Sequence, residues 1–176
     1  MSDIDQHFIA VFEATYVDLV RFAARRVERS RAEDIAAEAF ATAWRRRTDL
    51  PSTPDEARAW LFGIARILVL AHQRRANSAV TVQIENTLAV GDHQDSVIAH
   101  VDLASAWNRL TAVHQEALSV SAWDGLNSMQ AAVVLGISPV AYRIRLSRAR
   151  KALRIQLDLL EQAPSGPMGR IEEAKR

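Results

Sequence analysis

The stretch that begins at Asn127 constrains the fold of this chain most, because it carries the start and stop signals of two consecutive helices. Asn127 or its neighbour Ser128 can cap the first helix, and Gln130 is the reciprocal partner of a capping box if Asn127 is the cap. Gly136 stands where a left-handed residue would end that helix. Ser138 then caps a second helix whose first position is proline, where a missing amide hydrogen costs nothing. These signals together predict a helix-turn-helix.

The second of these helices has an apolar side and a strongly basic side. Apolar residues at helical spacing should face the core, and they are Tyr142, Leu146, Ala149 and Leu153. The basic residues that remain outside are Arg143, Arg145, Arg148, Arg150, Lys151 and Arg154, with no acidic residue before Asp158. A solvated face normally mixes charges, so a face of one sign favours a polyanion as partner. The alternative is a helical hairpin whose exterior is merely basic.

Nucleic-acid contact gives the residues of this second helix specific roles. Arginines read guanine edges or grip phosphates, and small apolar side chains can contact thymine methyl groups. The candidate DNA-contacting residues here are Val140, Ala141, Arg143, Ile144, Arg145, Ser147 and Arg148.

Composition excludes several other classes of protein. The chain has 176 residues, a formal net charge of only +1 and no cysteine, which excludes disulfides and thiolate metal sites. DNA binding must therefore come from local charge asymmetry. The longest apolar stretch, Leu61 to Ala71, contains Arg66 and is too short to span a bilayer. We therefore expect a soluble, intracellular, mostly helical protein without membrane contact of its own.

The pattern along the chain predicts an all-α fold of two small helical domains joined by a flexible linker. Residues 1–76 form the first domain, 77–95 the linker, 96–162 the second domain and 163–176 a disordered tail. Within the first domain, a helix should start with Thr53 as cap and Pro54 at its first position, and end at Arg74 and Arg75. The apolar face expected for this helix comprises Trp60, Leu61, Ile64, Ile67, Leu68 and Ala71.

The sequence gives little support for catalysis. The five histidines are scattered without ligand-like spacing, no glycine-rich phosphate loop exists, and no serine lies in a nucleophile motif. We therefore expect no enzyme activity, no metal and no cofactor.

The order of the segments resembles that of an extracytoplasmic-function (group 4) sigma factor, a promoter-recognition subunit of bacterial RNA polymerase. The resemblance covers roughly residues 8 to 158. Its N-terminal matching stretches are 32–44 and 58–66, and its C-terminal ones are 110–118, 124–126, 135–138 and 145–150. It implies a sigma-2-like first domain and a sigma-4-like second domain. The implied partners are the β′ coiled coil and β flap of core RNA polymerase, promoter DNA and, as for many family members, an anti-sigma factor.

For the first domain, the resemblance implies docking of residues 30–47 onto the β′ coiled coil. Asp34 and Glu38 lie four residues apart and share one helix face, which suits pairing with a basic partner helix. The alternative is that both carboxylates merely complement the helix dipole. Ala37 stands where the family usually has glutamine, so one polar contact is missing.

The helix that follows Pro54 matches the region that melts the promoter and recognises its minus-ten element. Extruded bases of a single strand stack on aromatic rings, and cations follow the phosphates. Phe62 is the preferred stacking residue here, because Trp60 lies on the apolar face of the helix. The minus-ten candidates are Arg58, Phe62, Arg66, Ile67, Ala71, Arg74 and Arg75. Ile67 and Ala71 stand where the family often has asparagine and aspartate, which indicates a divergent promoter.

The candidates of the second domain, Val140 to Arg148, match the minus-35 reader. The expected function is therefore that of a cytoplasmic, nucleoid-associated sigma factor that directs transcription initiation. The alternatives are a helix-turn-helix regulator that binds DNA without directing initiation, a helical enzyme and a protein-binding module.

Overall fold

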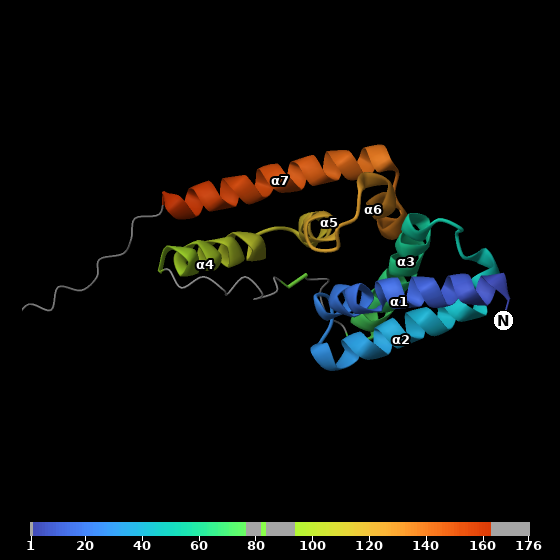
Figure 1. Cartoon of the computed structure of the whole chain (residues 1–176). Helices are drawn as coiled ribbons and strands as arrows, with labels where there is room; N and C mark the ends of the chain where they lie inside the picture. The colour runs from blue at the N-terminus through green and yellow to red at the C-terminus, as the bar shows by residue number, and fades with distance from the viewer. Residues whose placement is uncertain (1, 77–81, 84–93, 163–176) are drawn as a thin grey trace, which may run out of the picture.

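The computed structural model describes residues 2–76, 82–83 and 94–162, and in this part of the chain all regular structure is helical (Figure 1). The all-α prediction is therefore confirmed. The elements are α1 (Asp3–Ala24), α2 (Arg29–Arg45), the short 3-10 helix η1 (Arg47–Asp49), α3 (Pro54–Arg75), α4 (Gln94–Asn108), α5 (Ala112–Ala122), α6 (Ser128–Leu135) and α7 (Pro139–Glu161).

The first domain is a bundle of α1, α2 and α3 around an apolar core. Thr53 and Pro54 start α3 as predicted, and the Thr53 hydroxyl accepts a hydrogen bond from the Glu56 amide. The ring of Phe22 on α1 meets that of Phe62 on α3 edge to face, with 5.1 Å between the ring centres. Buried residues from all three helices complete this core, among them Leu19, Ala36, Ala39, Leu61 and Ala65.

The second domain packs α4 to α7 around a core centred on α5 and α7. Tyr142 of α7 is fully buried, and its hydroxyl donates a hydrogen bond to the carbonyl of Ala117 on α5 at 3.0 Å. Leu146 and Ala149 are buried on the same side of α7, as the helical spacing predicts. The outer side of α7 is thereby fixed toward solvent.

The helix-turn-helix forms from the signals in the sequence. Asn127 is the cap of α6: its side chain accepts from the Gln130 amide at 3.0 Å, and the Gln130 side chain accepts from the Asn127 amide at 2.9 Å. Gly136 ends α6 with φ 65° and ψ 37°. The Ser138 hydroxyl caps α7 by accepting from the Ala141 amide at 3.1 Å.

The two domains lie against each other, with α6 packed on α3 (Figure 1). Most of the predicted linker and the predicted tail, 163–176, lie outside the described residues. Two linker residues, Val82 and Gln83, are described: Val82 is buried between the domains, whereas Gln83 is exposed. Helix α4 begins at Gln94 and so includes the last two residues assigned to the linker.

Candidate nucleic-acid interface

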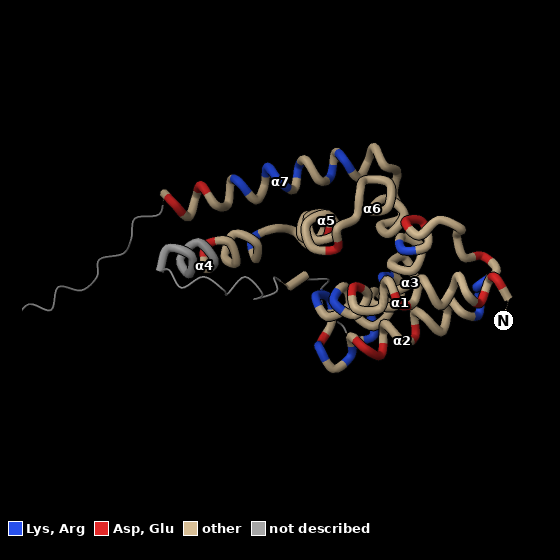
Figure 2. The backbone as a smooth tube through the Cα atoms, viewed as in Figure 1, with Lys and Arg blue, Asp and Glu red and all other residues tan. Residues whose placement is uncertain are grey.

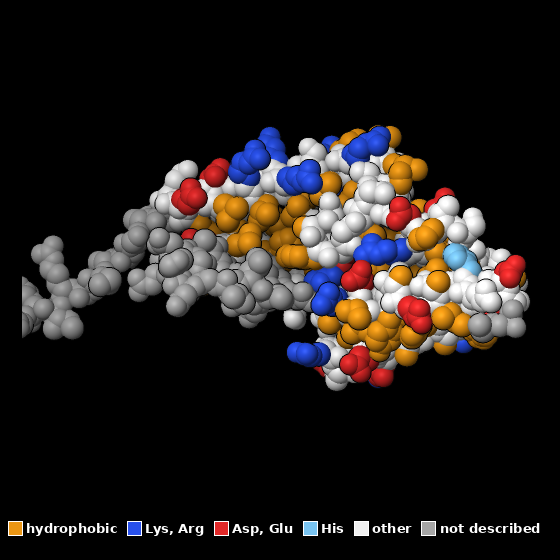
Figure 3. Space-filling model, viewed as in Figure 1, with side chains coloured by type: hydrophobic (Ala, Val, Ile, Leu, Met, Phe, Trp, Pro, Cys, Tyr) orange, Lys and Arg blue, Asp and Glu red, His pale blue; other side chains and the backbone are white. Residues whose placement is uncertain are grey.

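The outer side of α7 brings the predicted DNA-contacting residues together. Val140, Ala141, Arg143, Ile144, Ser147 and Arg148 are exposed, and Arg145 is half-buried. Val140 and Ile144 are 56% and 49% exposed, so this side of α7 presents apolar as well as basic side chains. Basic residues follow one another from Arg143 to Arg154, acidic residues occur only near the end of the helix, and basic side chains stand out over α7 in the space-filling view (Figures 2 and 3).

Two grooves flank this side of α7, and both carry cations. One groove of about 800 Å³ is lined by Arg143, Ser147, Arg150, Lys151 and Arg154, together with Ser121, Leu126, Asn127, Ser128 and Leu146. The other, of about 410 Å³, is lined by Val113, His114, Ala141, Ile144, Arg145 and Arg148. A helix with apolar and basic residues on its crest and cations on both flanks can contact base edges and the phosphates beside them.

On the first domain, α2 exposes the predicted carboxylate pair. Asp34 and Glu38 are both exposed on the same face, and Asp34 forms an ion pair with Arg31 at 2.8 Å. Large aromatic side chains are also exposed on α1 and α2, namely Phe12, Tyr16 and Trp44, with 39%, 37% and 41% exposure. An acidic helix face and exposed aromatic residues on the same two helices are suited to a protein partner.

The predicted minus-ten residues of α3 do not form one open surface. Arg74 and Arg75 are exposed at the end of the helix, whereas Arg58 and Arg66 are half-buried and paired with carboxylates. Ile67 is 63% exposed, so its expected place on the apolar face is wrong. Ala71, the other candidate at a position where the family often has a polar residue, is half-buried.

Phe62 cannot stack on a base in this conformation, and the preference for it over Trp60 is wrong here. Phe62 is fully buried against Phe22, and the Arg58 guanidinium covers its ring at 4.6 Å from the centre. Trp60 is only half-buried and lies within 5.6 Å of the Arg46 guanidinium. Periodicity placed Trp60 inside the core, but the positions on either side of it are the buried ones.

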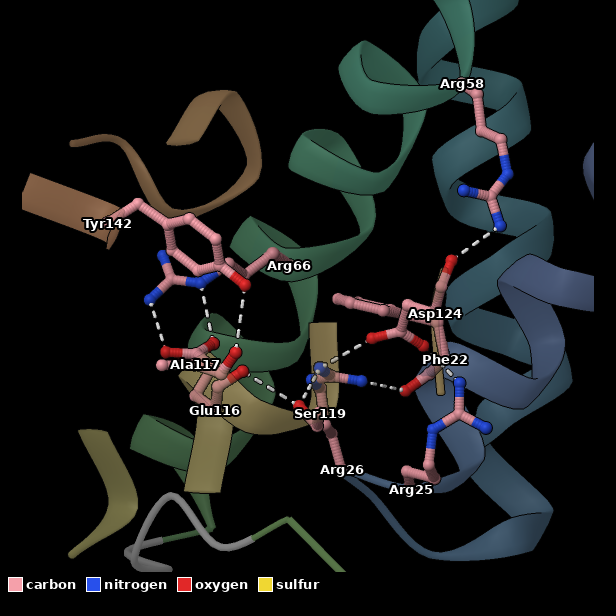
Figure 4. A network of polar contacts seen from close by, with 10 residues as sticks. All are labelled: Phe22, Arg25, Arg26, Arg58, Arg66, Glu116, Ala117, Ser119, Asp124 and Tyr142. Carbon is pink, nitrogen blue, oxygen red and sulfur yellow. Dashed lines mark hydrogen bonds and ion pairs between the residues drawn. The ribbon is translucent and has the colours of Figure 1, made fainter. Parts of the chain in front are cut away.

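The structure reveals a polar network between the domains that the sequence analysis missed (Figure 4). The Asp124 carboxylate is fully buried and forms ion pairs with Arg25 and, at 3.0 Å, with Arg26. Arg26 also donates to the Ser119 hydroxyl at 2.8 Å. Burial lowers the pKa of the Arg26 guanidinium, and the carboxylates of Asp124 and Glu116 oppose that shift.

The same network holds the two arginines of α3. Arg66 donates twice to the Glu116 carboxylate, at 2.8 and 3.0 Å. Arg58 pairs with Asp18 at 3.1 Å and donates to the backbone carbonyl of Asp124 at 2.8 Å. No sequence signal of short range connects these partners, because most of them lie 50 or more positions apart.

Two further properties concern chemistry and membranes. Among the described residues, no group of three or more histidines and acidic side chains is placed to hold a metal ion. None of the helices in that part of the chain combines the length and apolar character needed to cross a bilayer.

Comparison with known proteins identifies both domains. Residues 11–79 match sigma-70 region 2, and residues 100–153 match sigma-70 region 4. The ECF RNA polymerase sigma factor SigL of Mycobacterium tuberculosis is 30% identical over 157 residues, which cover 86% of this chain and 89% of the relative.

Solved structures show the same fold. The sigma factor RpoE in complex with the anti-sigma factor NepR from Bartonella quintana gives a TM-score of 0.60 at 21% identity, covering 90% of this chain and 99% of that one. CnrH in complex with the cytosolic domain of CnrY gives 0.58 at 25% identity, covering 86% and 88%. The two-domain helical architecture, the basic helix-turn-helix and these relatives agree, and the chain belongs to the sigma-70 family as an extracytoplasmic-function sigma factor, a promoter-recognising subunit of RNA polymerase.

Proposed function

We propose that this sigma factor is of group 4 and acts in the bacterial cytoplasm at the nucleoid, without catalytic activity of its own. The polymerase performs the chemistry, and this chain selects where it starts. In this proposal α2 binds the β′ coiled coil, the second domain binds the β flap and reads the minus-35 element, and α3 opens the minus-ten element. An anti-sigma factor is a further proposed partner, because RpoE and CnrH are each seen in complex with another protein, NepR and CnrY.

The observation that carries this proposal is the contrast in charge between two exposed helices. The outer side of α7 is basic and flanked by two cationic grooves, which suits a polyanion. The exposed face of α2 is acidic at Asp34 and Glu38, which suits a basic protein surface, and α1 and α2 also expose aromatic residues. A protein with both surfaces can hold DNA and a protein machine together.

Within α7, we assign the base-reading role to Val140, Ala141, Ile144, Arg145 and Arg148. Val140 and Ile144 lie on the exposed crest of the helix, Arg145 and Arg148 line the smaller groove beside it, and Arg143 and Ser147 line the larger one. Guanine edges accept two hydrogen bonds from an arginine fork, and thymine methyl groups accept apolar contact. Arg143 and Ser147 are assigned to phosphates on the other flank.

The test is promoter-dependent transcription with purified core polymerase and upstream DNA from the source genome. Transcript starts that need this protein are expected, and reversal of charge in Asp34→Lys/Glu38→Lys should lower their yield at least about tenfold, because like charges across an interface cost several kcal/mol. The matched control is Glu13→Lys/Glu28→Lys, which makes the same charge change at exposed positions of the first domain. This control should transcribe as the unaltered protein does.

Two results would contradict the proposal. If the protein binds duplex DNA with a steep salt dependence but produces no new starts, it is a regulator that has kept the fold without directing initiation. If the control variant loses transcription to the same extent as Asp34→Lys/Glu38→Lys, the loss reflects general charge and not docking at α2.

A further inference from the structure

One basic residue of α7 differs in its chemistry from the arginines around it. Of the 22 lysines and arginines of the chain only two are lysines, Lys151 and Lys175, and Lys175 lies outside the described residues. A lysine amine is a nucleophile that can be acylated, whereas an arginine guanidinium stays protonated in proteins. Lys151 is therefore the one lysine amine that the described part of the chain offers to an acyl donor.

Lys151 lines the larger of the two grooves beside α7. This groove has a volume of about 800 Å³, which is within the size range of small-molecule sites. Residues three, four or seven positions apart lie on one side of a helix, so three guanidinium groups of α7 face the groove together with the Lys151 amine. They belong to Arg143, Arg150 and Arg154, and all three arginines and Lys151 are exposed.

The remaining lining of this groove suits a phosphate group. Ser147 lies one turn before Lys151, and the hydroxyls of Ser121 and Ser128 come from the end of α5 and the start of α6. The start of a helix carries partial positive charge, so α6 adds to the attraction for an anion. Among the described residues, no acidic side chain lines the groove. Arginine forks bind phosphate oxygens in pairs, and hydroxyl groups donate to the oxygens that remain.

The Lys151 amine is not held by a carboxylate of the described residues. None of the ion pairs in residues 2–76, 82–83 and 94–162 includes Lys151. The first acidic residue of α7, Asp158, follows only two helix turns later. The amine therefore lies beside guanidinium and hydroxyl groups that can hold the anionic end of a ligand, and it can itself meet the other end.

We propose that this groove binds small acyl phosphates, such as acetyl phosphate, and that Lys151 is acylated there. In the reaction the neutral amine attacks the carbonyl carbon, and a bond forms between this carbon and the amine nitrogen. The bond from the carbonyl carbon to the bridging oxygen breaks, inorganic phosphate leaves with the electron pair, and the nitrogen loses one proton to solvent. The arginines are positioning residues, because they hold the phosphate so that the carbonyl carbon lies beside the amine.

Acylation of Lys151 would regulate the binding of DNA to α7. An acylated lysine is neutral, so the reaction removes one cation from the basic side of the helix. This consequence rests on the proposed function, because it requires that duplex DNA binds there. Acylation should then weaken binding several-fold for every DNA sequence and reduce the salt dependence by about 0.9, the value of one phosphate contact.

The reaction is measured first, without DNA or polymerase. The full-length protein is incubated with acetyl phosphate, and peptide mass spectrometry reports the rate of acetylation at Lys151 and at Lys175. The neutral N-hydroxysuccinimide ester of acetic acid has no phosphate, so it is the reference that corrects for the different exposure of the two amines. The ratio of the Lys151 rate to the Lys175 rate should be at least about tenfold higher with acetyl phosphate than with the ester, because the groove orients only the phosphate.

Two further measurements separate a phosphate site from an amine that is merely exposed. Arg154→Gln removes one guanidinium group from the groove and should lower the excess at Lys151 several-fold. Arg109→Gln is the matched control, because Arg109 is an exposed arginine of the same domain outside the groove, and it should leave the excess unchanged. Added inorganic phosphate should slow the reaction of Lys151 with acetyl phosphate and leave its reaction with the ester unchanged.

Each outcome decides the proposal. Equal ratios with the two reagents overturn the acyl phosphate site, as does an excess at Lys151 that survives both Arg154→Gln and competing phosphate. The effect on DNA is measured with Lys151→Gln and Lys175→Gln, which remove the same charge at two positions. Weaker duplex binding by Lys151→Gln alone supports the regulatory role, and equal binding by the two variants overturns it. Failure of transcription alone would bear on the proposed function and leave the acetylation ratios untouched.

Discussion

The two arginine-rich helices of this chain, α3 and α7, begin with the same kind of cap, but their arginines lie in opposite electrostatic surroundings. Each starts with a hydroxyl cap followed by proline, Thr53 in α3 and Ser138 in α7. On α3, Arg58 and Arg66 are ion-paired with carboxylates of α1 and α5. On α7, no carboxylate of the described residues forms an ion pair with the arginines or the lysine.

This difference teaches that residue type and local signals do not decide whether a cation is available to DNA. Helix α7 lies on the side of the second domain away from α1 and α2 (Figure 2), and Arg143, Arg148, Arg150, Lys151 and Arg154 on it are exposed. In the middle of α3, by contrast, Arg66 donates hydrogen bonds to the Glu116 carboxylate of α5. The outer side of α7, which we propose reads the minus-35 element, is therefore exposed, whereas Arg58 and Arg66 of α3 are half-buried and paired with carboxylates.

The largest effect we expect concerns Phe62. This candidate contact residue of α3 is buried, whereas candidate contact residues of α7 such as Val140 and Ile144 are exposed. Phe62→Ala should lower the free energy of unfolding by about 3–5 kcal/mol, the usual cost of removing a buried aromatic side chain. Urea denaturation measures it. Trp60→Ala is the control and should cost less, because Trp60 is only half-buried. Unchanged stability of Phe62→Ala with weaker binding of single-stranded DNA would instead restore Phe62 as a stacking residue.

The next effect concerns the charges that α7 presents. Arg145→Ala/Arg148→Ala should weaken binding to a promoter duplex by at least about 2 kcal/mol, roughly 30-fold, since each bidentate base contact is worth about 1–3 kcal/mol. The double variant should also reduce the salt dependence of binding if either arginine contacts a phosphate. Fluorescence anisotropy over a salt series measures both quantities. Arg21→Ala removes an exposed arginine of the first domain and should bind normally.

The helix-turn-helix could be predicted from sequence because its signals are local. Each capping residue bonds or turns the backbone within about one helix turn of its own position. In the structure, Asn127, Gln130, Gly136 and Ser138 start or end their helices as the sequence predicts. The exposed pair of Asp34 and Glu38 followed in the same way from the spacing of residues on one helix.

What could not be predicted depends on contacts between distant parts of the chain. Arg25 and Asp124 are 99 positions apart, and nothing near either residue indicates a buried partner. Periodicity also failed at the margins of an apolar face, where it placed Ile67 inside although this residue is 63% exposed. The burial of a side chain at such a margin depends on which helices pack beside it. For α3 these are α1 and α2 of the first domain and α6 of the second.

The smallest effect we expect uses the matching caps of the two helices. Ser138→Ala and Thr53→Ala each remove a hydroxyl that accepts a backbone amide hydrogen, so each should lower the free energy of unfolding by about 1 kcal/mol. Their effects on duplex DNA should differ. The first turn of α7 carries Val140 and Ala141 on the side that we propose faces DNA, and fraying there should weaken binding, whereas fraying at Thr53 should not.

Urea denaturation and duplex binding of both variants complete this comparison. Ser138→Gly and Thr53→Gly are the controls, because glycine at a cap costs only a few tenths of a kcal/mol. Equal losses of stability with weaker binding for Ser138→Ala alone would show that a cap matters to DNA only where its helix faces the duplex. Equal binding by Ser138→Ala and Thr53→Ala would mean that the first turn of α7 does not contact DNA, and base reading would then begin no earlier than Arg143.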